Sequence, residues 1–408
     1  MTASSEEGTV IGIVGNAARA RVTAWGAVRF ADGRHLDWWI AADDRWHVPA
    51  NGAHVPQRLV EGTPVVETTI RVPSGDVQQR VYGGGGGDGL VVLELENRSR
   101  LPVAIVLSSR DVLSARAPVA VPAGAGGIDL PADAASYPLA HGSIVRLAVP
   151  FGRRPDPVVS LPTSRQVAHG WRRRVDMGPR FVVPDDALAE SLVTARCRAL
   201  LDEPPSFVDD PAAAVVMASE RYRLREPIGL DVADIARAVG RCARARRRTP
   251  LSWTDAVMIE RAGELLDAAG ERRGAEDARQ LLLRSSVAPL PADMPTGMPT
   301  DLWRGPWLER GLAMTNGRQI ELLAGLPDAW FGQPVEVHDV PVGADRVGFA
   351  LRWHGARPAL LWDCSAPRRL MCSRLDASWS TDQARGEALL APPGETAVGL
   401  RQPGRTPC

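Results

Sequence analysis

Lysine is absent from this 408-residue sequence, so all 48 of its basic residues are arginine. They are balanced by 48 acidic residues, and the formal net charge is zero. A neutral chain lacks the broad positive field that attracts duplex nucleic acid or an anionic membrane surface. The composition therefore predicts neither nucleic acid nor a membrane as a partner.

Long apolar runs and paired cysteines are also absent. No stretch of about 20 apolar residues could span a bilayer, and the first ten residues, MTASSEEGTV, have neither the basic start nor the apolar run of a secretory signal. The five cysteines form no C-x-x-C pair and have no histidine at metal-ligand spacing. We therefore expect a cytoplasmic protein without a disulfide framework or a metal site.

The glycine-rich segments do not match a nucleotide-binding pattern. Residues Val10 to Asn16 lack the full G-x-G-x-x-G spacing and precede a predicted strand rather than a helix. The tract from Gly83 to Gly89 is not followed by the lysine of a P-loop and lies between predicted strands. No cofactor is expected from these segments.

Aromatic residues are few, except for tryptophan. The chain has 6 Phe and 3 Tyr but 12 Trp. An indole ring can fill a core, and its flat apolar face can also stack on a sugar ring while its N–H donates. We expect core packing for most of the twelve, and sugar binding is open for the rest.

Hydrophobic periodicity divides the chain into three kinds of segment. From about residue 9 to 150, apolar and polar residues alternate, as in the predicted strands 22–30, 65–72 and 77–82, with turns at Asp32-Gly33 and at 73–76. From Asp185 the period becomes helical, with further helices predicted at about 211–224, 231–247, 253–269 and 274–286. Strands return at 319–323, 335–340, 347–353 and 359–362.

The predicted fold is accordingly multidomain, with separate β and α parts. It consists of an N-terminal antiparallel β-sandwich (1–150), a proline-rich linker (151–184), a reduced α-helical bundle (185–308) and a small C-terminal β-sandwich domain (309–408). A second proline-rich linker is expected at 287–308.

One segment resembles a known family. Leu302-Trp303-Arg304-Gly305-Pro306-Trp307, directly after Asp301, is similar to the W-R-G-P-x-W segment of inverting glycosidases built on an (α/α)6 toroid, the glucoamylase and trehalase-like group, although it is one residue shorter. The order of β-sandwich, helices and small β domain also resembles the layout of that group. The resemblance implies an oligosaccharide or polysaccharide partner, with Trp303, Arg304 and Trp307 as substrate-binding residues.

The helical part is shorter than the resemblance requires. A complete toroid has about twelve helices, and at about 11–12 residues per helix the segment 185–308 holds about five or six. We therefore expect a half-toroid-like bundle. Apolar triplets at 215–217, 257–259 and 281–283 would then lack partners within the chain, which predicts that the linkers cover part of them and a homodimer the rest.

Catalysis by inversion needs two carboxyl groups about 6.5–9.5 Å apart. Asp301 is the candidate catalytic residue because it adjoins the tryptophan segment. Glu220-Arg221 and Glu260-Arg261 are typical of exposed helix residues, and Asp255, three residues after Ser252, is typical of a helix-capping arrangement. Asp209, Asp210 and Glu309 are the other acidic candidates.

Three functions remain open from the sequence. The preferred one is a glycan-binding or regulatory protein of glucoamylase-like layout with a degenerate catalytic site. The first alternative is an active glycoside hydrolase completed by oligomerisation, so the sequence does not decide whether the protein is an enzyme. The second alternative is a protein-interaction scaffold.

Overall fold

The computed structural model describes residues 8–85, 89–109, 111–122, 127–152, 160–227, 229, 232–246, 248–292, 300–316, 319–343 and 345–393. The chain divides into two compact units. The N-terminal unit comprises residues 1–174 and 200–202, and the C-terminal unit comprises residues 175–199 and 203–408.

The helices are α1 (Ser164–Val175), α2 (Asp186–Leu201), α3 (Pro211–Arg223), α4 (Val232–Ala245), α5 (Trp253–Ala268), α6 (Arg272–Arg284) and α7 (Thr300–Leu312). The strands of the N-terminal unit are β1 (Thr9–Gly12), β2 (Arg19–Val22), β3 (Val28–Phe30), β4 (His35–Leu36), β5 (Trp38–Ala41), β6 (Trp46–His47), β7 (Gln57–Leu59), β8 (Val65–Val72), β9 (Gly75–Gly84), β10 (Leu90–Asn97), β11 (Val103–Leu107), β12 (Leu113–Ser114), β13 (Ala135–Leu139) and β14 (Ile144–Pro150). Those of the C-terminal unit are β15 (Arg180–Val182), β16 (Ala313–Asn316), β17 (Gln319–Leu322), β18 (Val335–Val342), β19 (Asp345–His354), β20 (Arg357–Cys364), β21 (Arg369–Cys372), β22 (Asp376–Thr381) and β23 (Arg385–Leu389).

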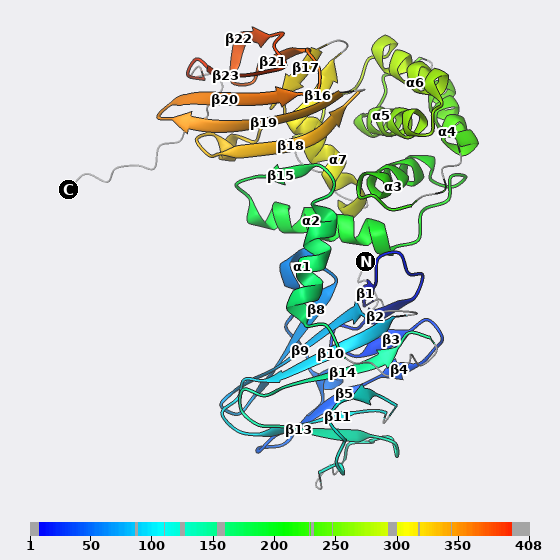
Figure 1. Cartoon of the computed structure of the whole chain (residues 1–408), viewed down its shortest axis with the longest axis vertical. Helices are drawn as coiled ribbons and strands as arrows, with labels where there is room; N and C mark the ends of the chain where they lie inside the picture. The colour runs from blue at the N-terminus through cyan, green and yellow to red at the C-terminus, as the bar shows by residue number, and fades with distance from the viewer. Residues whose placement is uncertain are drawn as a thin grey trace, which may run out of the picture. The chain divides into compact units, whose positions relative to one another are not determined.

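The N-terminal unit is an antiparallel β-sandwich (Figure 1). Its six-stranded sheet has the order β12-β14-β10-β9-β8-β7, and a four-stranded sheet has the order β13-β11-β5-β6. A third sheet, β1-β2-β3-β4, contributes to the same hydrophobic core. Val91, Leu93 and Leu95 of β10 are buried in that core, and Val92 and Glu94 on the other face of the strand are buried as well.

Two local predictions in this unit have different outcomes. The hairpin of β8 and β9 is confirmed, with Val72 opposite Gly75 and a turn at Pro73-Ser74. The single strand predicted over 22–30 is wrong, because the chain turns between β2 and β3. Gly26 adopts a φ of 86° there and its N–H donates to the carbonyl of Thr23, a conformation that glycine adopts without a steric cost.

The segment 151–184, predicted as a linker, contains secondary structure. Helix α1 begins after a capping box, in which Gln166 N–H donates to Thr163 Oγ1 and Thr163 N–H donates to Gln166 Oε1. Val167 and Ala168 of α1 pack on Tyr82 and Val92 of the six-stranded sheet. The segment therefore anchors a helix to the N-terminal unit, and its residues 153–159 lie outside the described residues.

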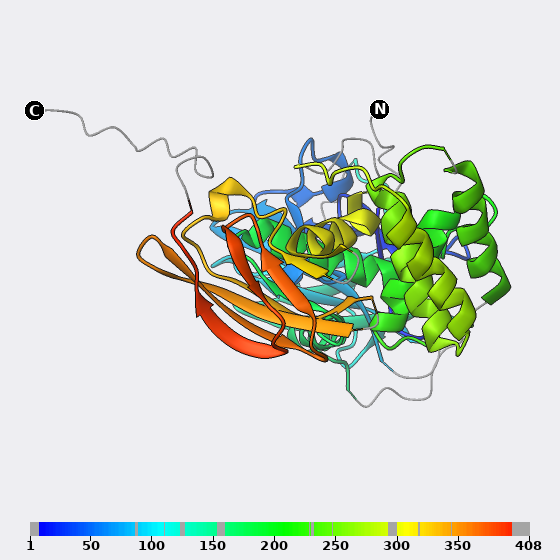
Figure 2. The same cartoon turned by 90° about the horizontal axis from the view of Figure 1, so that it is seen from above.

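The C-terminal unit combines two sheets with six helices. The sheets have the orders β15-β18-β19-β20-β23 and β16-β17-β21-β22, and β17 pairs with β21 in parallel. Helices α3 to α6 lie to one side of these strands, as Figure 2 shows in green beside orange and red. An edge-to-face pair of Trp362 and Trp379, with ring centroids 5.3 Å apart, packs against the sheet core.

The predicted helices agree with α3, α4, α5 and α6 to within about three residues at each end. The second predicted linker, 287–308, is wrong in its last third, where α7 forms despite Pro306 in its interior. Two of the three apolar triplets, 215–217 and 257–259, are buried within the chain itself. Residues 293–299 of that linker and 394–408 of the predicted C-terminal domain lie outside the described residues.

Candidate functional site

The residues predicted to bind sugar lie on α7, and its two indoles pack against neighbouring segments. The Trp303 side chain is only 4% exposed, and its ring lies edge-to-face with Trp253 of α5 at a centroid distance of 5.6 Å. Trp307 is half-buried, and its Nε1 donates to the carbonyl of Pro291 at 3.0 Å. The ring of Trp303 is therefore covered by the core of the C-terminal unit.

Arg304 and Asp301 are more accessible. Arg304 Nη1 donates to Ser191 Oγ at 3.1 Å, and Asp301 forms an ion pair with Arg198. Residues of α2 thus bind the Asp301 carboxylate and one nitrogen of Arg304, whereas Arg304 Nε is buried without a hydrogen-bond partner in the described part of the chain. The assignment of Asp301, Trp303, Arg304 and Trp307 to a sugar site stays a prediction.

A small hollow lies beside Asp301 in the C-terminal unit. Its lining includes Arg196 and Glu220, and its cavity volume is about 10 Å³, which is room for about one water molecule. Asp301 and Glu220 therefore share a hollow, as two cooperating carboxyl groups would. However, a pyranose ring does not fit in it.

Next to this hollow, α3, α5 and α7 meet at a buried charge cluster that consists of Glu220, Arg223, Arg261, Glu264 and Glu309. Arg223 Nη2 lies 2.7 Å from Glu264 Oε2, and its Nη1 lies 2.9 Å from Glu309 Oε2. Arg261 Nη2 donates to the same Glu309 oxygen at 3.0 Å. Together with Arg196 of α2, whose Nε lies 3.7 Å from Glu220 Oε2, three guanidinium groups face the three carboxyl groups, and this balance permits their burial.

The sequence prediction for part of this cluster is wrong. Glu220 and Arg261 were predicted to be exposed helix residues, but they are only 6% and 3% exposed. Their helices bury those faces because each charge finds opposite charges on the facing helices, a partnership that the sequence of one helix does not reveal.

Burial is the largest influence on the pKa values of Glu309 and Glu264 in this cluster. It raises the pKa of Glu309 to about 7, against the opposing effect of Arg223. Burial raises the pKa of Glu264 as well, again against Arg223. A carboxyl group with a pKa near 7 suits proton transfer, but Glu309 does not line the small hollow. Its contacts are those of a group that joins three helices.

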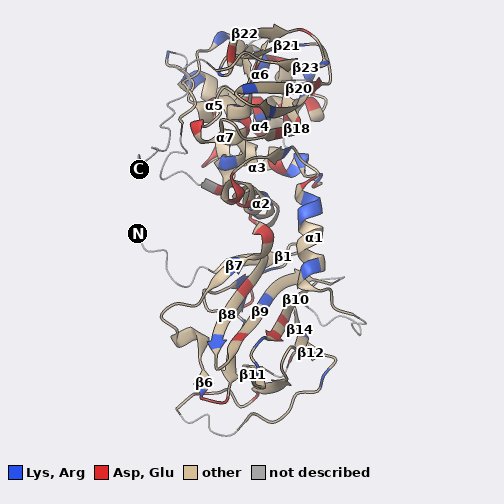
Figure 3. Cartoon of the chain, turned by 90° about the vertical axis from the view of Figure 1, so that its left-hand side faces the viewer, with Lys and Arg blue, Asp and Glu red and all other residues tan. Residues whose placement is uncertain are grey.

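A second set of charges forms a ladder across the outer face of the six-stranded sheet. Arg58, Glu67, Arg80, Glu94 and Arg146 stand opposite one another in register on β7, β8, β9, β10 and β14. The signs alternate from strand to strand, so every neighbouring pair is attractive. Figure 3 marks acidic and basic residues on the neighbouring strands β8, β9 and β10.

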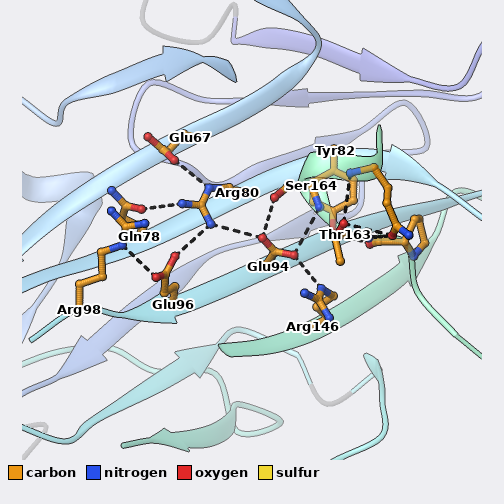
Figure 4. A network of polar contacts seen from close by, with 12 residues as sticks. Glu67, Gln78, Arg80, Tyr82, Glu94, Glu96, Arg98, Arg146, Thr163 and Ser164 are labelled. Carbon is orange, nitrogen blue, oxygen red and sulfur yellow. Dashed lines mark hydrogen bonds and ion pairs between the residues drawn. The ribbon is translucent and has the colours of Figure 1, made fainter. Parts of the chain in front are cut away.

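Glu94 of the ladder also contacts Ser164 at the N-terminus of α1 (Figure 4). Glu94 accepts from Ser164 Oγ at 2.6 Å, from Ser164 N–H at 3.3 Å and from Arg146 Nε at 2.7 Å. A negatively charged hydrogen-bond acceptor is favourable at the N-terminus of a helix, where backbone N–H groups lack partners. Burial acts to raise the pKa of Glu94, but these donors hold it below its ordinary value. The ladder is thus fully partnered and fastens α1 to the sheet.

A far larger hollow lies in the N-terminal unit, and we name it the Trp46 groove. Its volume is about 710 Å³, within the range of ordinary ligand sites. Strands β6 and β7 are the edge strands of the two main sheets, and the connection between them forms one wall of the groove. The groove is lined by Arg45, Trp46, His47, Val48, Pro49, Asn51, Gly52, His54, Val55, Pro56, Thr69, Ile70, Arg71 and Asp76.

The polar side chains of the Trp46 groove have few partners of their own. Arg71 Nη1 lies 3.0 Å from Asp76 Oδ1, and His47 Nε2 lies 3.0 Å from Asp44 Oδ1. Among the residues that the structure describes, no side chain bonds to Asn51 or His54. The groove therefore offers a half-buried indole surrounded by planar donors and acceptors.

The sequence analysis did not single out the Trp46 groove. Trp46 is one of twelve tryptophans. The pairing of β7 with β8 and the bond from Thr69 N–H to the carbonyl of Pro56 bring residues 45–56 beside residues 69–76. The turn-forming segment V-P-A-N-G that follows Trp46-His47 was the available signal, because binding residues are frequent on such loops.

No group of His, Cys, Asp and Glu within the described ranges could hold a metal ion. In the same part of the chain, each helix is too short or too polar to cross a membrane. No protein-family model matches the chain, and no curated protein sequence matches it.

Proposed function

We propose that this protein binds glycans and that the Trp46 groove is the binding site. The observation that carries the proposal is a groove of about 710 Å³ with a half-buried indole and unpartnered polar side chains. An indole face matches the apolar face of a pyranose, and the groups around it can pair with sugar hydroxyls.

The architecture adds support to this proposal. A leading β-sandwich, a set of helices and a further β part follow one another along the chain, in the order that the glucoamylase-like resemblance implies. We interpret the helices of the C-terminal unit as a reduced, half-toroid-like bundle. The proposal places glycan binding in the leading sandwich rather than in these helices.

The surroundings of Asp301 and Glu220 favour glycan binding over glycan hydrolysis as the function. Asp301 and Glu220 line a hollow with room for about one water, and each lies beside an arginine of α2. An inverting hydrolase needs space for a sugar and for a water between two carboxyl groups. An active hydrolase would therefore require a rearrangement of α7.

The proposal can be tested by titrating the full chain with a panel of soluble neutral and acidic polysaccharides, using affinity electrophoresis and calorimetry. Trp46→Ala is expected to weaken binding about tenfold, or about 1.4 kcal/mol, because it removes the stacking face. Trp39→Ala is the matched control, since Trp39 is also half-buried, lies on the neighbouring strand β5 and is outside the groove lining.

Two results would contradict the proposal. One is the absence of binding to every glycan in the panel. The other is binding that Trp46→Ala leaves unchanged and Arg304→Gln abolishes, which would place the site on α7. Hydrolysis of aryl glycosides that is lost in Asp301→Asn would favour the enzyme alternative.

A further inference from the structure

The Trp46 groove is lined by two exposed arginine side chains, and the nearby carboxylates of Asp44 and Asp76 occupy few of their donors. Two arginines, Arg45 and Arg71, line it, against one carboxylate, that of Asp76. The two arginines come from separate segments, the turn before β6 and the strand β8. Two accessible guanidinium groups in one groove of a neutral chain point to the ligand of this groove rather than to a general attraction for polyanions.

Most of the donors on these two arginines are free for a ligand. The Arg45 side chain is 74% exposed, and its contact with Asp44 is 3.7 Å long, beyond hydrogen-bond distance. The Arg71 side chain is 80% exposed and gives one nitrogen to Asp76 at 3.0 Å. A guanidinium has five N–H donors in a planar fork that matches a carboxylate.

Stacking and charge are therefore combined in one groove. A neutral sugar would use Trp46 and the hydroxyl partners, and would leave both guanidinium groups unmatched. A sugar with a carboxylate would use all of them, because a charge-assisted bond to arginine is stronger than a neutral one.

We propose that the Trp46 groove selects acidic saccharides, that is, chains of uronic acid residues whose carboxylates bind Arg45 and Arg71 while a ring stacks on Trp46. This inference rests on the proposed glycan-binding function and specifies its ligand class.

The test compares four probes of similar size by calorimetry on the full chain: trigalacturonate, its methyl ester, maltotriose and triglutamate. Trigalacturonate is expected to bind at least tenfold more tightly than its methyl ester, which has the same rings without the charge. Arg71→Gln and Arg45→Gln should each reduce that difference severalfold. Arg98→Gln is the matched control, because Arg98 is also an exposed arginine paired with one carboxylate, that of Glu96, outside the groove.

The outcomes separate this inference from the function on which it rests. Equal binding of trigalacturonate and its methyl ester, both dependent on Trp46, would leave glycan binding intact and overturn the selection of acidic sugars. Binding of triglutamate as tight as that of trigalacturonate would also overturn it, since the groove would then recognise anions without a sugar. Failure of every saccharide, neutral or acidic, would refute the proposed function itself.

Discussion

Glu94 is the residue on which the attachment of α1 depends. It is buried and accepts bonds from Ser164 and Arg146, so replacing its carboxylate by an amide would leave these two donors with one neutral acceptor oxygen in place of two charged ones. Glu94→Gln is expected to lower the unfolding free energy by about 2–3 kcal/mol, measured by urea denaturation, because bonds to charged groups are the strong ones. Glu96→Gln, which alters a more exposed carboxylate of the same strand, is expected to cost less than about 1 kcal/mol.

The acid sensitivity of the N-terminal unit follows from the same contacts. Burial acts to raise the pKa values of Glu67 and Glu94, but hydrogen bonds from Arg80 to Glu67 and from Ser164 to Glu94 hold both below their ordinary values. Such groups contribute stability above their unfolded pKa of about 4.5. This contribution to stability is lost as the pH falls through the lower pKa that each group has in the folded chain.

Glu309 is expected to have the opposite effect on the pH dependence of stability, stabilising the fold at low pH rather than at high pH. Burial raises its pKa from 4.5 in the unfolded chain to about 7, so the folded chain binds the proton more tightly. Its stabilising contribution is present below pH 4.5 and is lost as the pH rises to about 7, a change of about 3 kcal/mol. Hydrogen exchange in α3 and α7 at pH 5 and pH 8 measures it, and Glu309→Gln should remove this part of the pH dependence. An identical pH dependence in the variant would contradict the assignment.

At the level of elements, β1 and β9 approach each other closely. A Cβ atom on Gly83 would lie 2.3 Å from the carbonyl oxygen of Gly12, a backbone atom that has no side-chain freedom to move. Gly83→Ala is therefore expected to destabilise the N-terminal unit by about 3 kcal/mol, by thermal and urea denaturation. Gly170→Ala in α1 is the control, because a Cβ there meets nothing within 4 Å and alanine favours a helix. Equal stability of the two variants would contradict the close approach.

The elements that the sequence predicted well are those with strong local signals. The hairpin of β8 and β9 has Pro-Ser-Gly-Asp at its turn, and α5 begins with the capping box of Ser252 and Asp255, which the structure confirms. Helix α7 was not predicted, because prolines precede it and Pro306 lies within it. Helix α1 was overlooked although T-S-R-Q is a capping-box sequence.

The two candidate sites were harder to predict because they depend on long-range pairing. The buried charge cluster needs three helices to bring Arg223 to Glu264 and Glu309. The Trp46 groove needs the edge strands β6 and β7 to lie in their sheets before residues 45–56 meet β8. The loop V-P-A-N-G marks one wall of the groove in the sequence, but no single segment shows which residues meet to complete either site.

For the molecule as a whole, the apolar triplets bear on the oligomeric state. The linkers were expected to cover part of them and a homodimer the rest, but 215–217 and 257–259 are buried by the chain itself, and Leu283 is the exposed residue of the third. Little of this apolar surface is therefore left for a second subunit to cover. Light scattering at micromolar concentration is expected to give a mass near 43.8 kDa, and twice that mass would restore the dimer.

The edge-to-face tryptophan pairs have a spectroscopic consequence. Trp253 with Trp303 and Trp362 with Trp379 both belong to the C-terminal unit, and among the described residues the N-terminal unit has no ring pair of two indoles. Indoles about 5–6 Å apart couple their electronic transitions, which gives circular dichroism bands of opposite sign in place of a single band. Such a couplet would report the packing of the C-terminal unit alone, and its loss on denaturation would mark the unfolding of that unit.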